Sequence, residues 1–446
     1  MVDTRGGTGT DRRSGCTDPL GDLVLASHLA TMEQLPSVVA EHAARAGMSE
    51  VLIYLSDVQQ RSCFLLSEHG PQPGAVGEGE GEGEDEGEPA ELSLEGTVPG
   101  RAFQRGEVLP ATPAVGERTR WWVPLLDGAE RLGVLRVTTP ATAEPDTHRM
   151  RVLAGLVALL VVSKRGMSDF HARLVRRRQM NVAAELQWRL MQSQTFATER
   201  MVVSAAMEPA YEVSGDAFDY GLAGDLAYLS VFDGMGHDTA AGLTANLVVA
   251  SCRNSWRQGL GLVETARVAE RLLLEQTDGS RYVTAILASL DLAHGELSWV
   301  SCGHQVPILI RGGRTISMLE CPPGVPIGTG LHLPLTVCRH QLKPGDRLVL
   351  YTDGITEARR PGSDEFGVDR LTEFLILHQA DDLPVPETLR RLIHHHLQYH
   401  QGRLSDDATV LLMEWNGPHP FPPGEAEDLI GLPDQEPAVR PVSGAD

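Results

Sequence analysis

Short apolar runs bounded by glycine, aspartate and proline recur through the C-terminal half of the chain. Between residues 197 and 415 these runs are rich in β-branched and aromatic residues, which is typical of strands. Helical spacing of apolar residues appears in four windows between them, at 239–254, 263–276, 369–377 and 386–400. The pattern predicts one domain of interleaved strands and helices over 197–415.

The N-terminal half shows a different order of patterns. They predict a helix, two strands, a hairpin and a closing helix, at 23–47, 49–57, 61–67, 120–139 and 146–162. The longest apolar run, 152–162, is too short to cross a bilayer and indicates a buried helix. A first domain is therefore predicted over residues 21–165.

Polar or low-complexity segments flank and interrupt these regions. Residues 1–20 and 416–446 have the composition of disordered tails, and the acidic insert 77–89 is expected to be a solvated loop. Residues 166–196 are poor in glycine and lack proline, which predicts a helical linker. One face of this helix carries apolar residues, a pattern suited to a seam between two copies of the chain: Val182, Ala183, Leu186 and Leu190.

Composition narrows the classes of partner. The chain has 446 residues, a length that favours two domains, and a formal net charge of −22, which argues against nucleic acid or an anionic membrane as a partner. Its six cysteines lack CxxC spacing, so they predict neither a disulfide framework nor a zinc site. With no apolar signal segment at the N-terminus, these features predict a protein of the reducing cytoplasm.

Acidic residues recur where predicted strands begin or end. Asp233-Gly234 and Asp353-Gly354 each end an apolar run, and Asp406-Asp407 precedes another. One Asp-Gly pair by itself indicates a turn, but several carboxylates at strand ends repel one another unless a cation lies between them. An all-oxygen cluster without cysteine or paired histidine selects a hard cation, Mg²⁺ or Mn²⁺.

These acidic segments resemble the motifs of the RsbU/SpoIIE group of metal-dependent protein phosphatases, a bacterial branch of the phosphatase 2C-like (PPM) family. The resemblance covers about 197–415 and includes all four acidic motifs in order. The matching segments are SGDAFD, FDGMGHDTAAGLTA, YTDGITEARRPGSDEFGVDRL and SDDATVLLMEW. ELSWVSCGHQVPILIRGG and the helical NVAAELQWRLM are also similar to segments of that group.

The resemblance implies an αββα sandwich that binds two Mn²⁺ or Mg²⁺ ions. Asp233 would bridge both ions, and the Gly234 carbonyl would help to hold the second. Asp353 and Asp406 would hold the first ion, while Asp216 completes the site. Asp216 and Asp233 are thus the expected catalytic residues, placed around a water shared by the two metals that attacks phosphorus.

Other polar residues of these motifs have less defined roles. Asp219 either supports the site from outside or serves as a cap or turn residue. His237 either contacts substrate or metal-bound water, or makes a structural hydrogen bond near a helix start. Asp407 is expected behind the metal ligands and His304 in a structural role. Asp238 departs from the family motif, which has glycine there, and the run 394–396 of three histidines is expected on a surface helix.

The N-terminal order of elements, with the segment 96–101, resembles a GAF sensor domain. The expected fold class is therefore α+β, with a GAF-like domain, a helical linker and the phosphatase sandwich. The resemblance implies a cytoplasmic serine/threonine phosphatase that acts on a phosphorylated STAS protein, an anti-sigma factor antagonist. A homodimer could form through the linker or the GAF-like domain.

Two rival interpretations stay open at this point. A non-catalytic scaffold would be favoured by missing carboxylates, and none is missing. A phosphoesterase for small molecules would use the same metals. Turnover of a phospho-STAS protein compared with p-nitrophenyl phosphate separates the two enzymatic readings.

Overall fold

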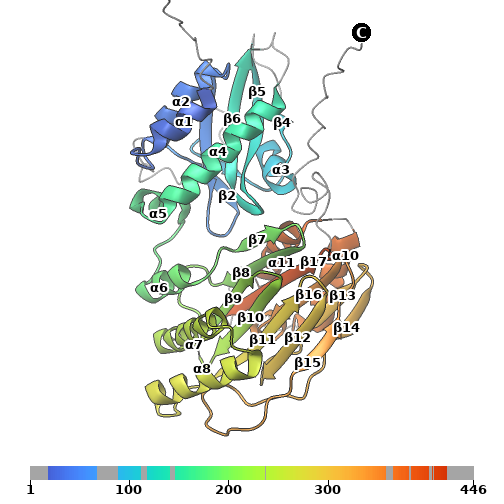
Figure 1. The fold of residues 1–446 in the computed structure, drawn as a ribbon. Helices are drawn as coiled ribbons and strands as arrows, with labels where there is room; N and C mark the ends of the chain where they lie inside the picture. Colours follow the sequence, from blue (N-terminus) through green and yellow to red (C-terminus); the bar gives the residue numbers. More distant parts are fainter. Residues whose placement is uncertain are drawn as a thin grey trace, which may run out of the picture.

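A computed structural model describes residues 19–67, 89–111, 118–140, 146–236, 238–357, 365–380, 383–400, 404 and 406–418. Most of the two predicted tails, most of the acidic insert and His237 lie outside these described residues, but residues 19–20, predicted to belong to the first tail, begin a helix. Figure 1 shows two bodies joined by short helices. No helix in the described ranges is long and apolar enough to span a membrane.

The N-terminal domain is a six-stranded antiparallel sheet with helices packed against it. The strand order is β3-β2-β1-β6-β5-β4. The strands are β1 (Glu50–Ser56), β2 (Ser62–Leu65), β3 (Glu91–Ser93), β4 (Leu109–Pro110), β5 (Arg118–Asp127) and β6 (Glu130–Pro140). The helices are α1 (Pro19–Ser27), α2 (Leu35–Arg45), α3 (Val98–Arg105) and α4 (Thr147–Arg165).

The predicted elements of this domain are confirmed, with one exception. The β5–β6 hairpin forms, and the apolar run of α4 packs onto β5 as a buried helix. The single helix predicted over 23–47 is instead two helices, because Pro36 fits only the first turn of a helix and α2 begins beside it. The GAF-like identity of the domain stays a prediction.

The linker prediction of one continuous helix is wrong. Two short helices form, α5 (Asp169–Val175) and α6 (Val182–Leu190). Tyr211 of the C-terminal domain holds the chain between them: its hydroxyl accepts from Arg177 N at 3.1 Å and its carbonyl from Asn181 N at 3.2 Å. Val182 and Leu186 of the predicted seam are 80% and 52% exposed in the single chain, and pairing of two copies through this face stays a prediction.

The C-terminal domain has four layers, and the predicted αββα sandwich is confirmed. One sheet has the order β15-β12-β11-β10-β9 and the other β14-β13-β16-β17-β8-β7. The first is built from β9 (Asp216–Ala223), β10 (Leu226–Gly234), β11 (Val283–Asp291), β12 (Glu296–Cys302) and β15 (Cys338–Gln341). The second is built from β7 (Thr195–Thr198), β8 (Met201–Glu208), β13 (Ile308–Arg311), β14 (Thr315–Met318), β16 (Asp346–Tyr351) and β17 (Ala408–Trp415).

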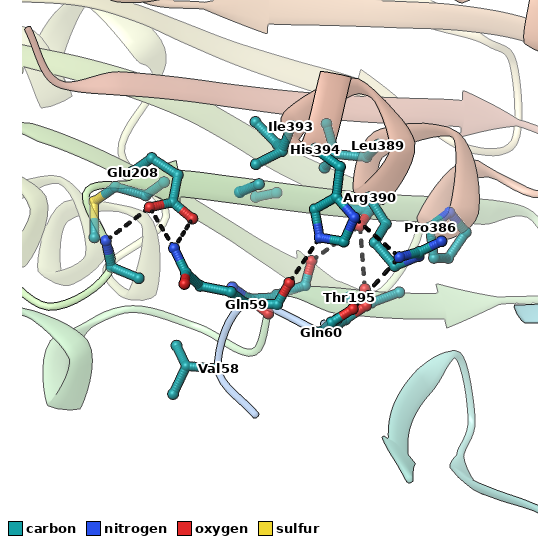
Figure 2. A pocket seen from close by; sticks show the side chains of 16 residues that line it. Val58, Gln59, Gln60, Thr195, Glu208, Pro386, Leu389, Arg390, Ile393 and His394 are labelled. Atoms are coloured by element: carbon teal, nitrogen blue, oxygen red, sulfur yellow. Dashed lines mark hydrogen bonds between the residues drawn. The ribbon is translucent and has the colours of Figure 1, made fainter. Parts of the chain in front are cut away.

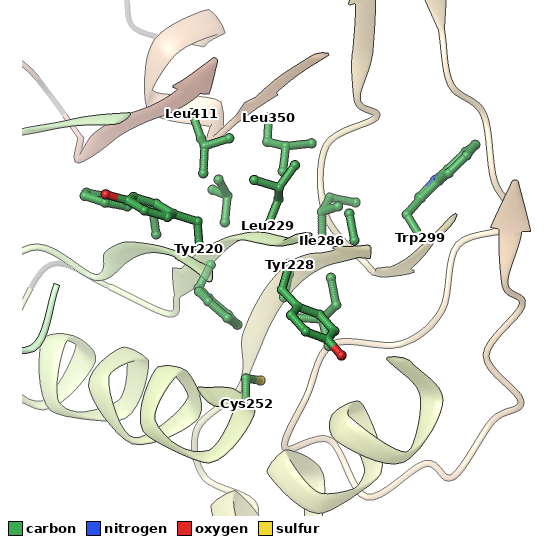
Figure 3. Close-up of a cluster of buried hydrophobic side chains, with 14 of the residues drawn as sticks. Tyr220, Tyr228, Leu229, Cys252, Ile286, Trp299, Leu350 and Leu411 are labelled. Carbon is green, nitrogen blue, oxygen red and sulfur yellow. The ribbon is translucent and has the colours of Figure 1, made fainter. Parts of the chain in front are cut away.

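Helices cover the outer faces of both sheets. On the first lie α7 (Thr239–Arg257) and α8 (Leu262–Thr277), and on the second lies α11 (Val385–Tyr399) with α10 (Gly367–Ala380) beside it; α9 (Asp353–Thr356) is a single turn. Figure 3 shows Leu350 and Leu411 of one sheet facing Leu229 of the other within one apolar cluster. On the opposite face of β10, Tyr228 stacks on Trp256 of α7 at 5.0 Å between ring centroids. Because both faces of β10 are buried, its sequence is almost continuously apolar.

The two domains contact each other through the loop after β1. The Gln59 side chain donates to both carboxylate oxygens of Glu208, at 2.9 and 3.0 Å, and the Gln59 carbonyl accepts from His394 Nε2 at 3.0 Å (Figure 2). A cavity of about 50 Å³, the size of a water molecule or two, lies among these residues. Arg390 adds a second link, since it donates to Glu95 at 2.7 Å.

This contact corrects the prediction for the three histidines at 394–396. They were expected on a surface helix: His395 is exposed, but His394 is partly buried at the domain contact, and His396 is fully covered beside Phe366. The helical pattern of α11 alone does not reveal that a second domain packs beside it.

The cysteine prediction also needs correction. Cys321 and Cys338 form a disulfide across 17 residues, whereas Cys63, Cys252 and Cys302 are free and buried. The two bonded residues meet because β15 pairs with β12 and brings the end of the loop back to the sheet edge. Nothing in their sequence spacing indicates this pairing.

The buried ion pair of α11 generates a stability prediction. Arg390 donates to both oxygens of Glu387, at 2.9 and 3.0 Å, and both side chains are buried. Arg390→Ala should lower the free energy of unfolding by about 3–5 kcal/mol, because it leaves a buried carboxylate short of its main partner. Urea denaturation followed by circular dichroism measures this loss.

Arg391→Ala is the matched control, since Arg391 donates to the same carboxylate from a more exposed position. It should cost less than about 1 kcal/mol. Equal losses in the two variants would contradict the view that burial makes the Arg390 pair important.

Candidate metal centre

Two acids face each other at the end of the β9–β10 hairpin. Asp216, the first residue of β9, lies opposite Asp233 near the end of β10. The backbone is close-packed here: Gly234 N donates to Gly215 O at 2.9 Å. A Cβ on Gly215 would lie 2.3 Å from the Gly236 carbonyl oxygen, so no other residue fits that position.

Two further acidic segments reach the same place from the second sheet. Asp353 begins α9 directly after β16, and Asp406-Asp407 directly precedes β17, which pairs with β16. A Cβ on Gly354 would lie 1.8 Å from the Asp407 carbonyl oxygen. The glycine therefore permits the close approach that brings the two segments together.

Hydrogen bonds tie the acidic ends of the two sheets to each other. Asp407 Oδ2 accepts from Gly215 N at 2.5 Å, and Asp216 Oδ2 accepts from the Thr352 hydroxyl at 2.6 Å. The Thr352 hydroxyl oxygen accepts in turn from Thr409 N at 2.9 Å. These bonds fix the position of Asp216 and tie the ends of the two sheets together.

The pKa values show that these carboxylates repel one another. Burial, followed by the charges of Asp353 and Asp406, raises the pKa of Asp233 to about 7. Burial and the charge of Asp233 raise the pKa of Asp216 well above its usual value. Burial and the charge of Asp406 also raise the pKa of Asp353.

The cluster receives little compensation from positive side chains. No Lys, Arg or His of the described residues forms a salt bridge with Asp216, Asp233, Asp353 or Asp406. A divalent cation would relieve the repulsion, and the oxygen-only donors suit Mg²⁺ or Mn²⁺. The donor chemistry thus fits a metal site, although among the described residues no three such side chains already converge around one point.

The other residues singled out from the sequence have structural roles. Asp219 is fully buried and binds Arg253 of α7 at 2.5 and 3.1 Å, so it anchors this helix to β9. The predicted cap or turn role is wrong, and the predicted support of the site from outside stays a prediction. The His304 ring bonds to Thr284 Oγ1 at 2.6 Å and donates to Tyr351 O at 3.0 Å, which confirms its structural role. Burial lowers the pKa of His304 to about 4 and keeps the ring neutral. Asp407 accepts from the backbone of Gly215, and its place behind the metal ligands stays a prediction.

Sequence analysis did not find Gln187. This α6 side chain is fully buried and donates to Ser214 O at 3.0 Å and Asp216 O at 2.7 Å, while it accepts from Ser214 N at 3.1 Å. It therefore clamps the backbone of the first acidic motif from the linker. The available signal was a polar residue one helical turn after Ala183 and Ala184, on the same buried face of α6.

Comparisons with known proteins place this region in a family. Residues 224–416 match the family model described as Stage II sporulation protein E (SpoIIE). With the sandwich fold and the acid cluster, this part of the chain is a SpoIIE-family phosphatase domain of the PP2C type. The match leaves the N-terminal domain unassigned.

Similar proteins align over about half of the chain. Protein IcfG of Synechocystis is 25% identical over 48% of this chain and 38% of its own length. Phosphoserine phosphatase RsbU of Bacillus subtilis is 20% identical over 53% of this chain and 69% of its own length. The chain thus spans well under half of IcfG. A solved structure, the SiaA-PP2C domain of Pseudomonas aeruginosa, is 19% identical, with a TM-score of 0.44, and the match covers 52% of this chain and 94% of that one.

The Gln187 clamp generates a prediction for stability. Gln187→Ala leaves the N–H and carbonyl groups of Ser214 buried without their partner, so the free energy of unfolding should fall by about 1–3 kcal/mol. Arg189→Ala is the control, because Arg189 lies on the exposed side of the same helix and pairs only weakly with Glu185. Urea unfolding of both variants checks this, and equal stability of the two would mean that the clamp contributes nothing.

Proposed function

We propose that this protein is a metal-dependent phosphatase that hydrolyses phosphoserine or phosphothreonine on another protein. The proposal is carried by the position of Asp216, Asp233, Asp353 and Asp406 at neighbouring strand ends of a PP2C-type sandwich, where burial and the charges of other acids raise the pKa values of Asp216, Asp233 and Asp353. Such a cluster is stable in its charged form only with cations bound. Phosphate esters are anionic, so they too need that positive charge.

Each acid receives a role in this proposal. Asp233 would bridge two ions of Mn²⁺ or Mg²⁺, with the Gly234 carbonyl on the second ion, Asp353 and Asp406 on the first, and Asp216 on the other side. When bound, the ions would supply an activated water for in-line attack on phosphorus. Thr352 keeps one oxygen of Asp216 occupied and thereby sets the direction of the other. Asp407 holds the Gly215 backbone in place.

The proposed substrate is a phosphorylated STAS protein that antagonises an anti-sigma factor. Two similar curated proteins, RsbU and RsbP of Bacillus subtilis, are phosphoserine phosphatases by name. The N-terminal domain would act as a GAF-like sensor, and pairing of two copies through it or through the linker is part of the proposal. The proposed location is the cytoplasm, where the Cys321–Cys338 bond would be subject to reduction.

Metal dependence tests the proposal directly. Phosphate release from a phospho-STAS protein should rise with added Mn²⁺ or Mg²⁺ and disappear with EDTA, because oxygen ligands hold these ions reversibly. p-Nitrophenyl phosphate serves as the parallel small substrate. Full turnover by dialysed protein in excess chelator would disprove the two-metal site. Turnover of p-nitrophenyl phosphate without turnover of the phospho-STAS protein would mean that the protein is a phosphatase for a different class of substrate.

The bridging carboxylate gives a second test. Asp233→Asn removes one charge from the site but keeps the size of the side chain, so the fold should survive. The rate at saturating Mn²⁺ should fall on the order of a thousandfold or more, which corresponds to several kcal/mol of transition-state stabilisation.

Asp278→Asn is the control for this substitution. Asp278 also precedes a glycine, but it ends α8 in a left-handed conformation that asparagine tolerates. Its rate should stay within about a factor of two of the wild type. If folded Asp233→Asn protein keeps near wild-type turnover, Asp233 is only a turn residue and not a metal ligand.

A further inference from the structure

The turn after Asp233 is held from outside the acid cluster. Residues Gly234, Met235 and Gly236 connect β10 toward α7, and the segment before β11 runs beside them. Met235 N donates to Tyr282 O at 3.2 Å, and the Met235 carbonyl accepts from Arg281 Nη1 at 3.1 Å. Both polar groups of the Met235 backbone therefore have partners in residues 281–282.

The same arginine binds the residue at which α7 starts. Asp238 Oδ1 accepts from Ala241 N at 2.7 Å as the helix cap, and its two oxygens lie 3.4 and 3.3 Å from Arg281 Nη1 and Nη2. The Ala241 amide and the Arg281 guanidinium lower the pKa of Asp238, which is thus charged at neutral pH. Arg281 thus links Met235 to Asp238: Nη1 contacts both residues, and Nη2 contacts Asp238.

We propose that Arg281 is a positioning residue that fixes this turn in the conformation required for metal binding. The proposal rests on the proposed function, in which Asp233 and the Gly234 carbonyl hold metal. A turn already held on both sides loses little conformational freedom when an ion binds to Gly234. Asp238 contributes to this positioning because its charge orients the Arg281 guanidinium.

The geometry favours positioning over direct contact with substrate. The Arg281 side chain is 26% exposed, and both terminal nitrogens already have partners in Met235 and Asp238. The planar guanidinium holds Met235 O and both oxygens of Asp238 through two nitrogens in a fixed geometry, whereas lysine offers one nitrogen. Lysine at this position should therefore restore only part of the effect.

Direct measurement of Mn²⁺ binding by electron paramagnetic resonance tests the proposal on the full-length protein. Arg281→Ala should weaken Mn²⁺ binding about tenfold, the usual cost of losing a group that orients metal ligands. Arg281→Lys should fall between the alanine variant and the wild type. At saturating Mn²⁺ the KM for p-nitrophenyl phosphate should be unchanged.

A matched control exists in the same domain. Arg200 pairs with Asp225 at a hairpin turn, and the exposed fractions of that pair, 27% and 61%, nearly equal the 26% and 61% of Arg281 and Asp238. Arg200→Ala should leave Mn²⁺ binding unchanged. If both alanine variants weaken binding equally, the effect is one of surface charge and the proposal is wrong.

The remaining outcomes also test the proposal. Unchanged Mn²⁺ binding by folded Arg281→Ala with a raised KM would make Arg281 a substrate contact and overturn positioning. If the alanine variant does not fold, wild-type Mn²⁺ affinity in Arg281→Lys overturns it as well. Wild-type protein that binds Mn²⁺ but releases no phosphate from either substrate would disprove the proposed function and leave the role of Arg281 in metal binding supported.

Discussion

Repulsion between carboxylates held at fixed positions is the constraint on which this domain depends. Asp216 and Asp233 are opposite each other on paired strands, so neither can withdraw without breaking the ladder. The second sheet brings Asp353 and Asp406 to the same edge, and burial together with the charges of these two acids raises the pKa of Asp233 to about 7. The free energy that this crowding costs must come from elsewhere in the fold. The extensive apolar interior between the two sheets and under α7 is the available source.

Close backbone packing at the edge of that interior fixes the positions of the acidic segments. Gly215 and Gly354 lie where any Cβ would overlap a carbonyl oxygen, so both sheets end in segments that only glycine allows. Around them, each polar group is fixed by a partner from a different element: Thr352 holds Asp216, Gln187 holds its backbone, and Arg281 holds the turn after Asp233. The site thus takes its geometry from four separate parts of the chain.

Local patterns in the sequence predicted most strands and helices of the C-terminal domain, the sandwich, and the acids at strand ends. Each of these depends on residues close together in the chain, such as the apolar run of β10 and the Asp-Gly that follows it. The errors concern contacts between distant residues. Tyr211 binds the non-helical segment between α5 and α6, the loop at Gln59 contacts α11, and Cys321 meets Cys338 across a loop. Gln187 and Arg281 also act on segments far from their own positions, which no local period reveals.

The positions of the strands along the chain determine when each strand pairing can form during synthesis. β17 pairs with β16 on one side and with β8 on the other, and Ala408 lies opposite Glu208, nearly half the chain away. Such pairings are slow to form, because a long loop must close before any contact stabilises it. While the ribosome is still adding residues, the first sheet can assemble with Asp216 and Asp233 in place. The second sheet stays open until Asp406 and β17 emerge, so a nascent chain carries half of the acid cluster and gains the rest only with its final pairing.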